Sequence, residues 1–318
     1  MGSATLAGCA VGPNYVAPHE RALAVFMGGA AVEARATPVG TADLLNWWRS
    51  FDDPILTSLV EQALVQNLDV QQAVARVTQA RASLKKANAA LLASGQVSGQ
   101  VGDSYQSLRT PVGRIANTTP GFQRNSQIYE VDLGARWEID AFGGLSRSEE
   151  VARDDLQASQ ATAVASRLAV AAETADTYIA IRGLQERIAI ARSQVETQQR
   201  LVDTVALQYR EGVAAELQLR QSEGALAPVK ASVSVLENSL DVAMNALDVL
   251  VGMQPGTNRT MLEKVSAIPV PPRVATAGGP AGLLRRRPDI IAAERLLAAS
   301  NARIGAAIAE YYPKFSLS

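Results

Sequence analysis

The stretch that decides the fold is residues 146–209, SRSEEVARDDLQASQATAVASRLAVAAETADTYIAIRGLQERIAIARSQVETQQRLVDTVALQY. It contains no proline and a single glycine, Gly183. Its apolar residues recur at steps of three and four, many of them are small, and polar residues fill the gaps. This pattern predicts one helix, about 100 Å long at ~1.5 Å per residue, that packs side by side with other helices. A plain coiled-coil rod is the alternative interpretation.

A second helix is predicted to return alongside the first. Gly212 is a plausible C-terminal cap of the first helix, and the apolar period resumes over residues 216–251. Pro228 lies inside this second helix and is expected to kink or split it. The long helix pair therefore occupies residues 146–251, with the tip of the hairpin at residues 212–216.

The period changes in residues 129–140, where apolar and polar side chains alternate. One face carries Tyr129, Val131, Leu133, Ala135, Trp137 and Ile139, and the other carries Glu130, Asp132, Gly134, Arg136, Glu138 and Asp140. This predicts a two-faced strand of about 12 residues, close to the ~9–11 residues of a tilted transmembrane strand. A weaker strand at residues 97–105 and a polar loop complete a hairpin over residues 96–140. An amphipathic hairpin on a soluble sheet is the alternative.

Before this hairpin, aromatic residues precede another predicted helix. Trp47, Trp48 and Phe51 lie just ahead of Asp53 and Pro54, a pair that suits a helix start. The helix is expected at residues 55–92, with a break near residues 67–69. The two tryptophans are interpreted as packing anchors rather than as ligand-binding residues.

The N-terminal region contains the sequence Leu6-Ala7-Gly8-Cys9, followed by Gly and Pro. Small residues before a lone cysteine resemble the lipobox of bacterial lipoproteins, although the usual charged and apolar signal regions are missing. Cys9 is therefore the predicted site of lipid attachment, which would anchor the chain without spanning the bilayer. The alternative is an ordinary cysteine in an extended tail.

Composition excludes several classes of protein. The formal net charge is −1, so no electrostatic footprint of nucleic-acid binding is present. One histidine and one cysteine rule out a disulfide framework, a His/Cys zinc cluster and most histidine-based triads. The sequence contains no run of about 18 apolar residues, so no transmembrane helix is predicted. We expect no cofactor, no metal site and no enzymatic activity; a hydrolase using a pair of carboxylates is the remote alternative.

The C-terminal part repeats an earlier order of elements. Shifting the chain by 220 residues places Asp289 on Asp69 and Ala302 on Ala82, and residue 317 on Val97. A helix and then the beginning of a strand are thus predicted to recur. The expected organisation is a truncated signal and leader at 1–45, a first repeat at 46–256, a linker at 257–282 and a truncated second repeat at 283–318.

In its ordered motifs the chain resembles the outer-membrane factor family, the TolC/NodT-type efflux ducts of Gram-negative bacteria. The matching motifs are Cys9 with Gly12-Pro13-Asn14-Tyr15, Trp47-Trp48 through Phe51-Asp53-Pro54, Asn67-Leu68-Asp69, Trp137-Glu138-Ile139-Asp140 with Phe142-Gly143, Asn245-Ala246-Leu247 with Leu250-Val251-Gly252, Arg286-Arg287-Pro288-Asp289-Ile290, Ala293-Glu294, Ile304-Gly305 and Tyr312-Pro313. Each motif is weak by itself, but their combination in family order is specific.

The resemblance implies a mainly α fold with a transmembrane β-hairpin. Long antiparallel helical hairpins would form a periplasmic α-barrel, and the β-hairpin would supply part of a trimeric outer-membrane β-barrel. The implied protein is a homotrimer and a lipid-anchored export duct for drugs or other small solutes. Its implied partners are a periplasmic adaptor protein and, through it, an inner-membrane pump.

The resemblance also implies roles for individual residues. Those expected to face the lumen are Glu130, Asp132, Arg136, Glu138 and Asp140, and those expected to face lipid are Tyr129, Val131, Leu133, Trp137 and Ile139. Gly212, Val213 and Leu217 would contact the adaptor. The second hypothesis is that the chain is itself a periplasmic adaptor with a helical hairpin. The position of the clear strands, before the long helix rather than on both sides of a hairpin, favours the duct.

Overall fold

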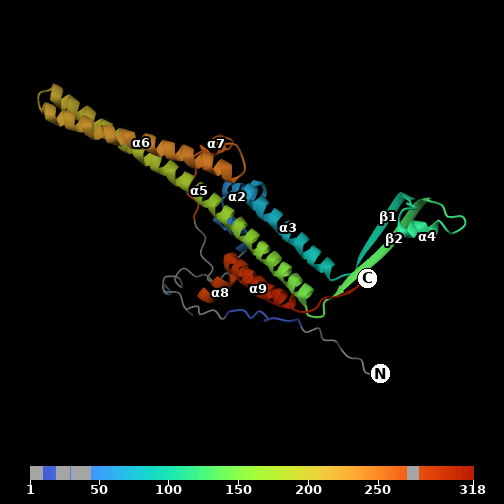
Figure 1. Cartoon of the computed structure of the whole chain (residues 1–318). Coiled ribbons are helices and arrows are strands. Elements are labelled where there is room, and N and C mark those ends of the chain that lie inside the picture. The colour runs from blue at the N-terminus through green and yellow to red at the C-terminus, as the bar shows by residue number, and fades with distance from the viewer. Residues whose placement is uncertain (1–9, 19–28, 30–43, 271–278) are drawn as a thin grey trace. The chain divides into compact units, whose positions relative to one another are not determined.

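The computed structural model describes residues 10–18, 29, 44–270 and 279–318, and it is mainly helical (Figure 1). Cys9 lies outside the described residues. In chain order the elements are η1 (Leu44–Phe51), α2 (Pro54–Gln66), α3 (Leu68–Ala90), β1 (Ser94–Tyr105), α4 (Pro111–Ala116), β2 (Asn125–Ile139), α5 (Gly144–Arg210), α6 (Glu216–Leu250), α7 (Arg259–Leu262), α8 (Gly279–Arg286), α9 (Pro288–Ala309) and β3 (Phe315–Leu317).

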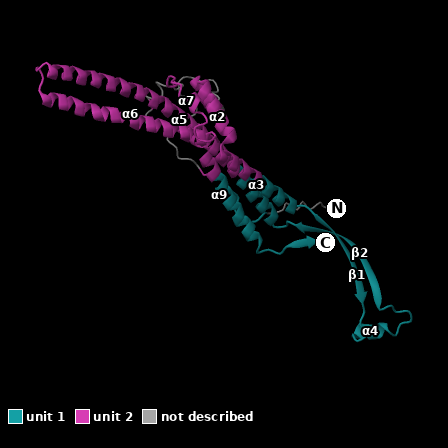
Figure 2. Cartoon of the chain, turned by 90° about the horizontal axis from the view of Figure 1, so that it is seen from above, with its two compact units in different colours: residues 1–17, 79–157, 294–318 teal, residues 18–78, 158–293 magenta. Residues whose placement is uncertain are grey.

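Contacts divide the chain into two compact units, which Figure 2 shows in different colours. Unit 1 comprises residues 1–17, 79–157 and 294–318, and unit 2 comprises residues 18–78 and 158–293. Both units are therefore assembled from segments that are far apart in the sequence.

The helix predicted at residues 146–209 is confirmed: α5 is one helix of 67 residues. Alanine occupies five of its buried positions in unit 2, Ala158, Ala161, Ala171, Ala175 and Ala191. Alanine favours helix, and its small side chain allows neighbouring helices to approach closely. The abundance of alanine in this chain thus serves side-by-side helix packing.

The core of unit 2 combines side chains from η1, α2, α3, α5, α6 and α7. Among its members are Leu56, Leu59, Val60, Tyr178, Ile181, Leu247 and Leu262. Trp48 belongs to this core, and Trp47 meets it edge to face with ring centroids 6.0 Å apart. The interpretation of the two tryptophans as packing anchors is confirmed.

The expected break near residues 67–69 separates α2 from α3. Asn67 Oδ1 accepts hydrogen bonds from the backbone N–H groups of Asp69 and Val70, which begins α3. Asn67 Nδ2 donates to the backbone oxygen of Leu250 at the end of α6, at 3.0 Å. One buried asparagine therefore satisfies two helix ends and joins residues that are 183 positions apart.

Of the two outcomes expected for Pro228, a kink or a split, the split does not occur, because α6 continues through the proline as one helix. Polar links to α5 flank the proline. Lys230 Nζ donates to Gln199 Oε1 at 3.0 Å, and Arg192 pairs with Glu237 at 2.7 Å. Packing along the length of α5 thus outweighs the missing hydrogen bond and the local steric cost of a proline.

The sheet in unit 1 has the order β1-β2-β3 and is antiparallel throughout. β1 and β2 pair from Ser94 opposite Arg136 to Tyr105 opposite Asn125. The predicted hairpin is therefore present, although β2 begins at Asn125 and ends at Ile139 rather than at Asp140. The predicted polar loop contains a short helix, α4, which Thr110 caps by accepting a hydrogen bond from the N–H of Gly113.

The predicted recurrence of elements is visible in their positions. α9 begins at Pro288, 220 residues after α3 begins at Leu68, and each helix is followed by a strand. β3 pairs with the final residues of β2, Phe315 opposite Ile139 and Leu317 opposite Trp137. Among the described helices, none combines the length and the apolar character needed to cross a bilayer.

Candidate functional sites: the β-hairpin and the helical tip

The register of β1 and β2 gathers apolar side chains on one face of the hairpin. Val101 lies opposite Tyr129, and Val97 lies opposite Leu133. Directly opposed residues of an antiparallel pair point to the same side, so the alternation in β2 is matched by that of β1. The side chains of Val131 and Leu133 are 82% and 83% exposed, whereas apolar side chains on the packed face of a soluble sheet are buried. This row of bare apolar side chains requires an apolar environment or partner.

The opposite face is polar on both strands. Glu130 lies opposite Gln100, and Asp132 lies opposite Ser98. Arg136 lies opposite Ser94, whose hydroxyl donates to the Arg136 backbone oxygen at 3.1 Å. The face expected to be wet therefore carries acidic groups beside neutral hydrogen-bonding residues and one arginine.

The base of β2 differs from the rest of the strand. Trp137 is only 42% exposed, and its Nε1 donates to the backbone oxygen of Leu91 at 3.1 Å, just beyond the end of α3. Ile139 is also half covered and pairs with Phe315 of β3. Both residues belong to the predicted apolar face, and they lie at the edge of the exposed row.

Asp140 requires a correction, because it does not lie on the polar face of the strand. β2 ends at Ile139, and the Asp140 carboxylate caps α5 by accepting hydrogen bonds from the N–H groups of Leu145 and Ser146 at 3.0 and 2.7 Å. The first turn of a helix has free N–H groups and the positive end of the dipole, which attract a carboxylate. The alternating pattern runs one residue past the strand and hides this capping role.

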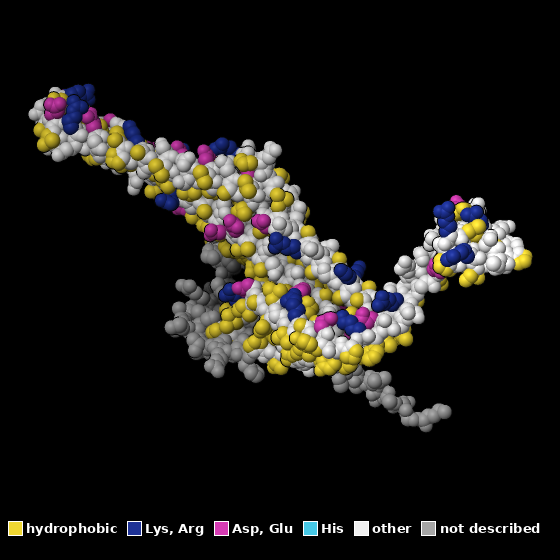
Figure 3. All heavy atoms as spheres, in the orientation of Figure 1, with side chains coloured by type: hydrophobic (Ala, Val, Ile, Leu, Met, Phe, Trp, Pro, Cys, Tyr) yellow, Lys and Arg dark blue, Asp and Glu magenta, His cyan; other side chains and the backbone are white. Residues whose placement is uncertain are grey.

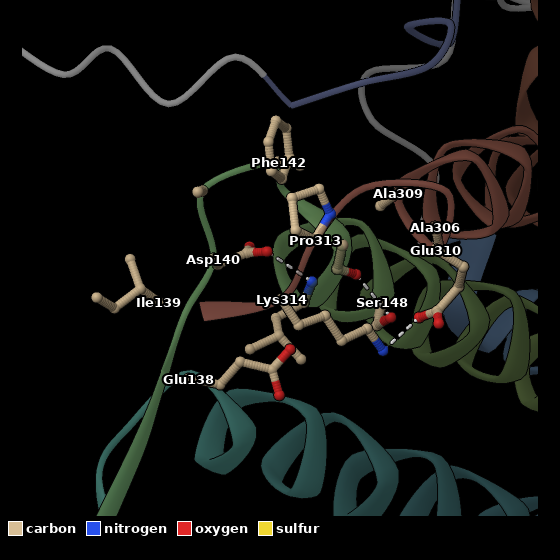
Figure 4. A pocket seen from close by; sticks show the side chains of 13 residues that line it. Glu138, Ile139, Asp140, Phe142, Ser148, Ala306, Ala309, Glu310, Pro313 and Lys314 are labelled. Atoms are coloured by element: carbon tan, nitrogen blue, oxygen red, sulfur yellow. Dashed lines mark hydrogen bonds and ion pairs between the residues drawn. The ribbon is translucent and has the colours of Figure 1, made fainter. Parts of the chain in front are cut away.

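A small pocket lies where β2, α5 and α9 meet (Figure 4). Its volume is about 90 Å³, and Lys314, Glu310 and Glu138 line its polar side. Lys314 Nζ donates to Glu310 Oε1 at 2.8 Å. Pockets for drug-sized ligands are several times larger, so this pocket is a junction between elements and not a binding site for a transported solute.

The tip of the α5–α6 hairpin matches its sequence-based description. Gly212 has φ +75°, the left-handed conformation of a helix cap, and the N–H of Val213 donates to the oxygen of Gln208 at 2.8 Å. Val213 and Leu217 are exposed. Acidic, basic and apolar side chains lie together at this end of the hairpin (Figure 3). The tip is thus a mixed surface with apolar residues available to a partner.

A buried polar cluster in unit 2 was missed by sequence reasoning. Tyr178 donates its hydroxyl to Asp53 Oδ2 at 2.8 Å, and burial raises the pKa of this tyrosine. The fully buried Arg182 lies over the Tyr178 ring, 4.8 Å from its centroid, and donates to the backbone oxygens of Leu262 and Lys264 at 3.2 and 2.7 Å. An arginine on a helix of mixed polarity is expected at the surface, so only tertiary structure reveals the cluster.

A second missed feature is the buried Arg147 of unit 1. Its guanidinium contacts Val11, Gly12 and Asn14 near the beginning of the chain and also pairs with Glu150. The sequence analysis used residues 12–15 only as part of a family resemblance. The signal in the sequence that could have indicated a docked N-terminal segment is the glycine–proline–asparagine motif close to the unique cysteine.

Comparison with known proteins decides the family. The family described as outer membrane efflux protein matches residues 59–253 of this sequence. The chain belongs to the outer membrane efflux protein family. The resemblance proposed from its motifs is therefore confirmed, and the alternative of a periplasmic adaptor is set aside.

Individual relatives agree with this family assignment. Nodulation protein T of Rhizobium leguminosarum bv. trifolii is 32% identical over 316 residues, covering 99% of this chain and 64% of that protein. The pyoverdine export outer membrane protein OpmQ of Pseudomonas aeruginosa is 30% identical over 285 residues, covering 87% and 58%. The chain thus spans about three fifths of the length of these relatives.

A solved structure confirms the fold class. The outer-membrane channel OprN superimposes with a TM-score of 0.78 and 32% identity, covering 97% of this chain and 66% of the other. Long helical hairpins joined to a β-hairpin are therefore the fold of this family. The family is one of channels and not of enzymes.

Proposed function

We propose that this chain is part of an outer-membrane duct that exports drugs or other small solutes from a Gram-negative cell. It would pass solutes without chemistry, with energy supplied by an inner-membrane pump. The observation that carries the proposal is the presence, in one chain of this family, of a hairpin with one bare apolar face and a long helical hairpin. The apolar face of the β-hairpin is suited to contact with lipid, and the long helical hairpin is suited to form part of a tunnel wall.

In this proposal the two faces of the hairpin have separate roles. Tyr129, Val131 and Leu133 face lipid, with Trp137 and Ile139 near the membrane surface, where tryptophan is favoured. Glu130, Asp132, Arg136 and Glu138 face the lumen and give it a polar, cation-tolerant wall. The neutral partners of Glu130 and Asp132 across the sheet leave these carboxylates available to passing ions.

A second copy of the chain is the proposed occupant of the remaining exposed apolar surface. Leu296, Leu297 and Ile304 of α9 are each about half exposed, and apolar side chains gather over this helix in Figure 3. A homotrimer would cover such surfaces. Gly212, Val213 and Leu217 at the tip would contact a periplasmic adaptor, and Cys9 would carry the lipid anchor.

Fractionation and native mass provide the test. The chain would be produced behind a complete lipoprotein signal, extracted from outer membranes and weighed in its native state, and dye accumulation would be measured in cells that lack their own duct. A trimer in the outer membrane and lowered dye accumulation are expected. A monomer in the periplasmic fraction would contradict the proposal.

A further inference from the structure

Three distant parts of the sequence meet around residues 10–14, which we name the docked segment. The N–H of Val11 donates to the backbone oxygen of Phe142 at 3.1 Å, in the turn between β2 and α5. On the other side, Asn301 of α9 donates its Nδ2 to the oxygen of Pro13 at 2.9 Å. The docked segment therefore lies between the beginning of α5 and α9, within unit 1.

Arg147 makes most of the polar contacts that hold the docked segment. Its Nη2 donates to Asn14 Oδ1 at 2.8 Å and to the Gly12 oxygen at 3.4 Å, and its Nε donates to the Val11 oxygen at 3.3 Å. Glu150 pairs with Nη1 at 2.7 Å, and the arginine side chain is 6% exposed. A buried guanidinium satisfied by four acceptors is a built recognition site rather than a chance surface contact.

Two glycines make the close approach possible. Gly12 has φ +92°, and a Cβ at this position would lie 2.5 Å from the Cα of Gly305 on α9. A Cβ on Gly305 would in turn lie 2.9 Å from Arg147 Nε and 3.0 Å from the Val11 oxygen. The path of the chain and the position of the arginine thus both depend on missing side chains.

We propose that Arg147 is a positioning residue that fixes the point at which Ala10, the residue after Cys9, is held. Gly143 marks this point, because a Cβ there would lie 2.6 Å from the Cα of Ala10, and consecutive Cα atoms are about 3.8 Å apart. The lock consists of Arg147, Gly12, Asn14 and Gly305.

This inference rests on the proposed lipid attachment to Cys9 for its consequence. A lipid on Cys9, one residue before Ala10, would then be tethered close to Gly143 and the end of β2. The docked segment would then set the height of the hairpin relative to a lipid surface, in addition to keeping the protein attached.

Hydrogen exchange of the purified chain tests the lock without any lipid. In the wild type the Val11 amide should be protected, and Arg147→Ala should raise its exchange at least tenfold while amides in the middle of α5 stay unchanged. Arg153→Ala is the matched control, because Arg153 lies on the same helix and forms a surface ion pair with Glu149 at 2.8 Å. Equal exchange of Val11 in the wild type and in Arg147→Ala would overturn the proposal.

The acceptor side offers variants that leave every helix intact. Asn14→Ala removes the 2.8 Å acceptor and should also raise Val11 exchange, whereas Asn14→Asp keeps an oxygen for Arg147 and should preserve protection. If the Val11 amide exchanges at the wild-type rate in both variants, the hydrogen bond between Asn14 and Arg147 does not hold the docked segment, and the proposal is contradicted.

A spin label on Cys9, the only cysteine of the sequence, reports the position of the docked segment directly. With a second label on Ala141→Cys, strong dipolar broadening is expected and should disappear in Arg147→Ala. Broadening that persists in that variant contradicts a positioning role. A closed lock in a chain that never receives lipid in cells would refute the lipid claim of the proposed function alone. An open lock in a chain that forms a membrane-bound trimer would refute this inference alone.

Discussion

The hydroxyl of Tyr178 donates a hydrogen bond of 2.8 Å to Asp53 Oδ2, across 125 positions of sequence. Asp53 Oδ1 at the same time caps α2 through the N–H groups of Ile55 and Leu56. One carboxylate therefore fixes the beginning of a helix and its docking against the middle of α5. Both oxygens are used, so removing Tyr178 leaves a partly buried carboxylate oxygen without this partner, and removing Asp53 leaves a buried hydroxyl without an acceptor.

Tyr178→Phe should destabilise the protein by about 1.5–3 kcal/mol, because it removes a hydrogen bond from a buried hydroxyl to a charged, partly buried acceptor. The midpoint of urea unfolding, followed by circular dichroism, measures the loss. Tyr209→Phe is the matched control, since this tyrosine of α5 is 40% exposed, and it should leave the midpoint unchanged. Equal midpoints for the two variants would show that the bond to Asp53 contributes nothing.

Asp154→Asn should stabilise the protein at neutral pH. Burial raises the pKa of Asp154 above its ordinary value of 3.8, while Arg295, 3.7 Å away, opposes the shift. The folded state therefore favours the protonated carboxyl, and that contribution to stability is lost as the pH rises through the raised pKa.

The advantage of Asp154→Asn over the wild type should accordingly shrink as the pH falls through the raised pKa of Asp154, and it should be gone below the ordinary value of 3.8. Asp155→Asn serves as the comparison, because Asp155 is more exposed and pairs with Arg303 at 2.7 Å. Urea midpoints at several pH values distinguish the two. A lower midpoint for Asp154→Asn at pH 7 would mean that the attraction to Arg295 outweighs burial.

Gly252→Ala should cost about 1–3 kcal/mol of stability. Gly252 has φ +75°, and a Cβ would lie 2.9 Å from the backbone oxygen of Gln66. Gly256→Ala separates the two causes, since Gly256 has φ +91° but open space around a Cβ among the described residues. A cost for Gly252→Ala no greater than that for Gly256→Ala would remove the steric part of the explanation.

Gly183→Ala should have the opposite sign and stabilise the protein by about 0.5–1 kcal/mol. Gly183 lies inside α5, and within the described part of the chain a methyl group added there would meet nothing within 4 Å. Unfolding midpoints again provide the measurement. A destabilised variant would indicate that another subunit approaches α5 closely at this residue.

Val131→Arg and Leu133→Arg should each impair insertion of the hairpin, by about 2–4 kcal/mol near the bilayer midplane, if the apolar face meets lipid. Asp132→Leu lies between them on the opposite face and should insert normally. Recovery of each variant in the outer-membrane fraction is the measurement. Normal insertion of both arginine variants, with loss of Asp132→Leu, would invert the assignment of the two faces.

Leu217→Asp should weaken binding of a periplasmic adaptor without changing the unfolding midpoint, because Leu217 is exposed at the tip. Binding to a periplasmic adaptor protein can be measured by co-purification. Val235→Asp, an equally exposed substitution on α6 away from the tip, is the control. A similar loss of binding in both variants would contradict a specific contact between the adaptor and the tip.

The features predicted well from sequence are those with a local cause. The 3.6-residue period of α5 and the alternation in β2 are properties of neighbouring residues, and the caps at Asp53 and Gly212 use residue types suited to those positions. The residues around Pro228 do not by themselves distinguish a kinked helix from a split one, because contacts with α5, such as that between Lys230 and Gln199, keep α6 continuous.

The missed site residues have a different cause. Asp140 continues the alternating pattern, so only the end of pairing at Ile139 separates its capping role from a place on the strand face. Arg147 and Asn14 are 133 positions apart, and Arg182 meets backbone oxygens 80 or more positions away. Contacts of that range leave no periodic trace in a single sequence.

The lock also sets an order of events as the chain is made. Asn301, which donates to Pro13 across 288 positions, emerges long after the docked segment. At about 5–20 residues per second of synthesis, some tens of seconds separate the two. The contact between Asn301 and Pro13 is therefore absent throughout that interval, and residues 10–14 dock fully only after α9 has been produced.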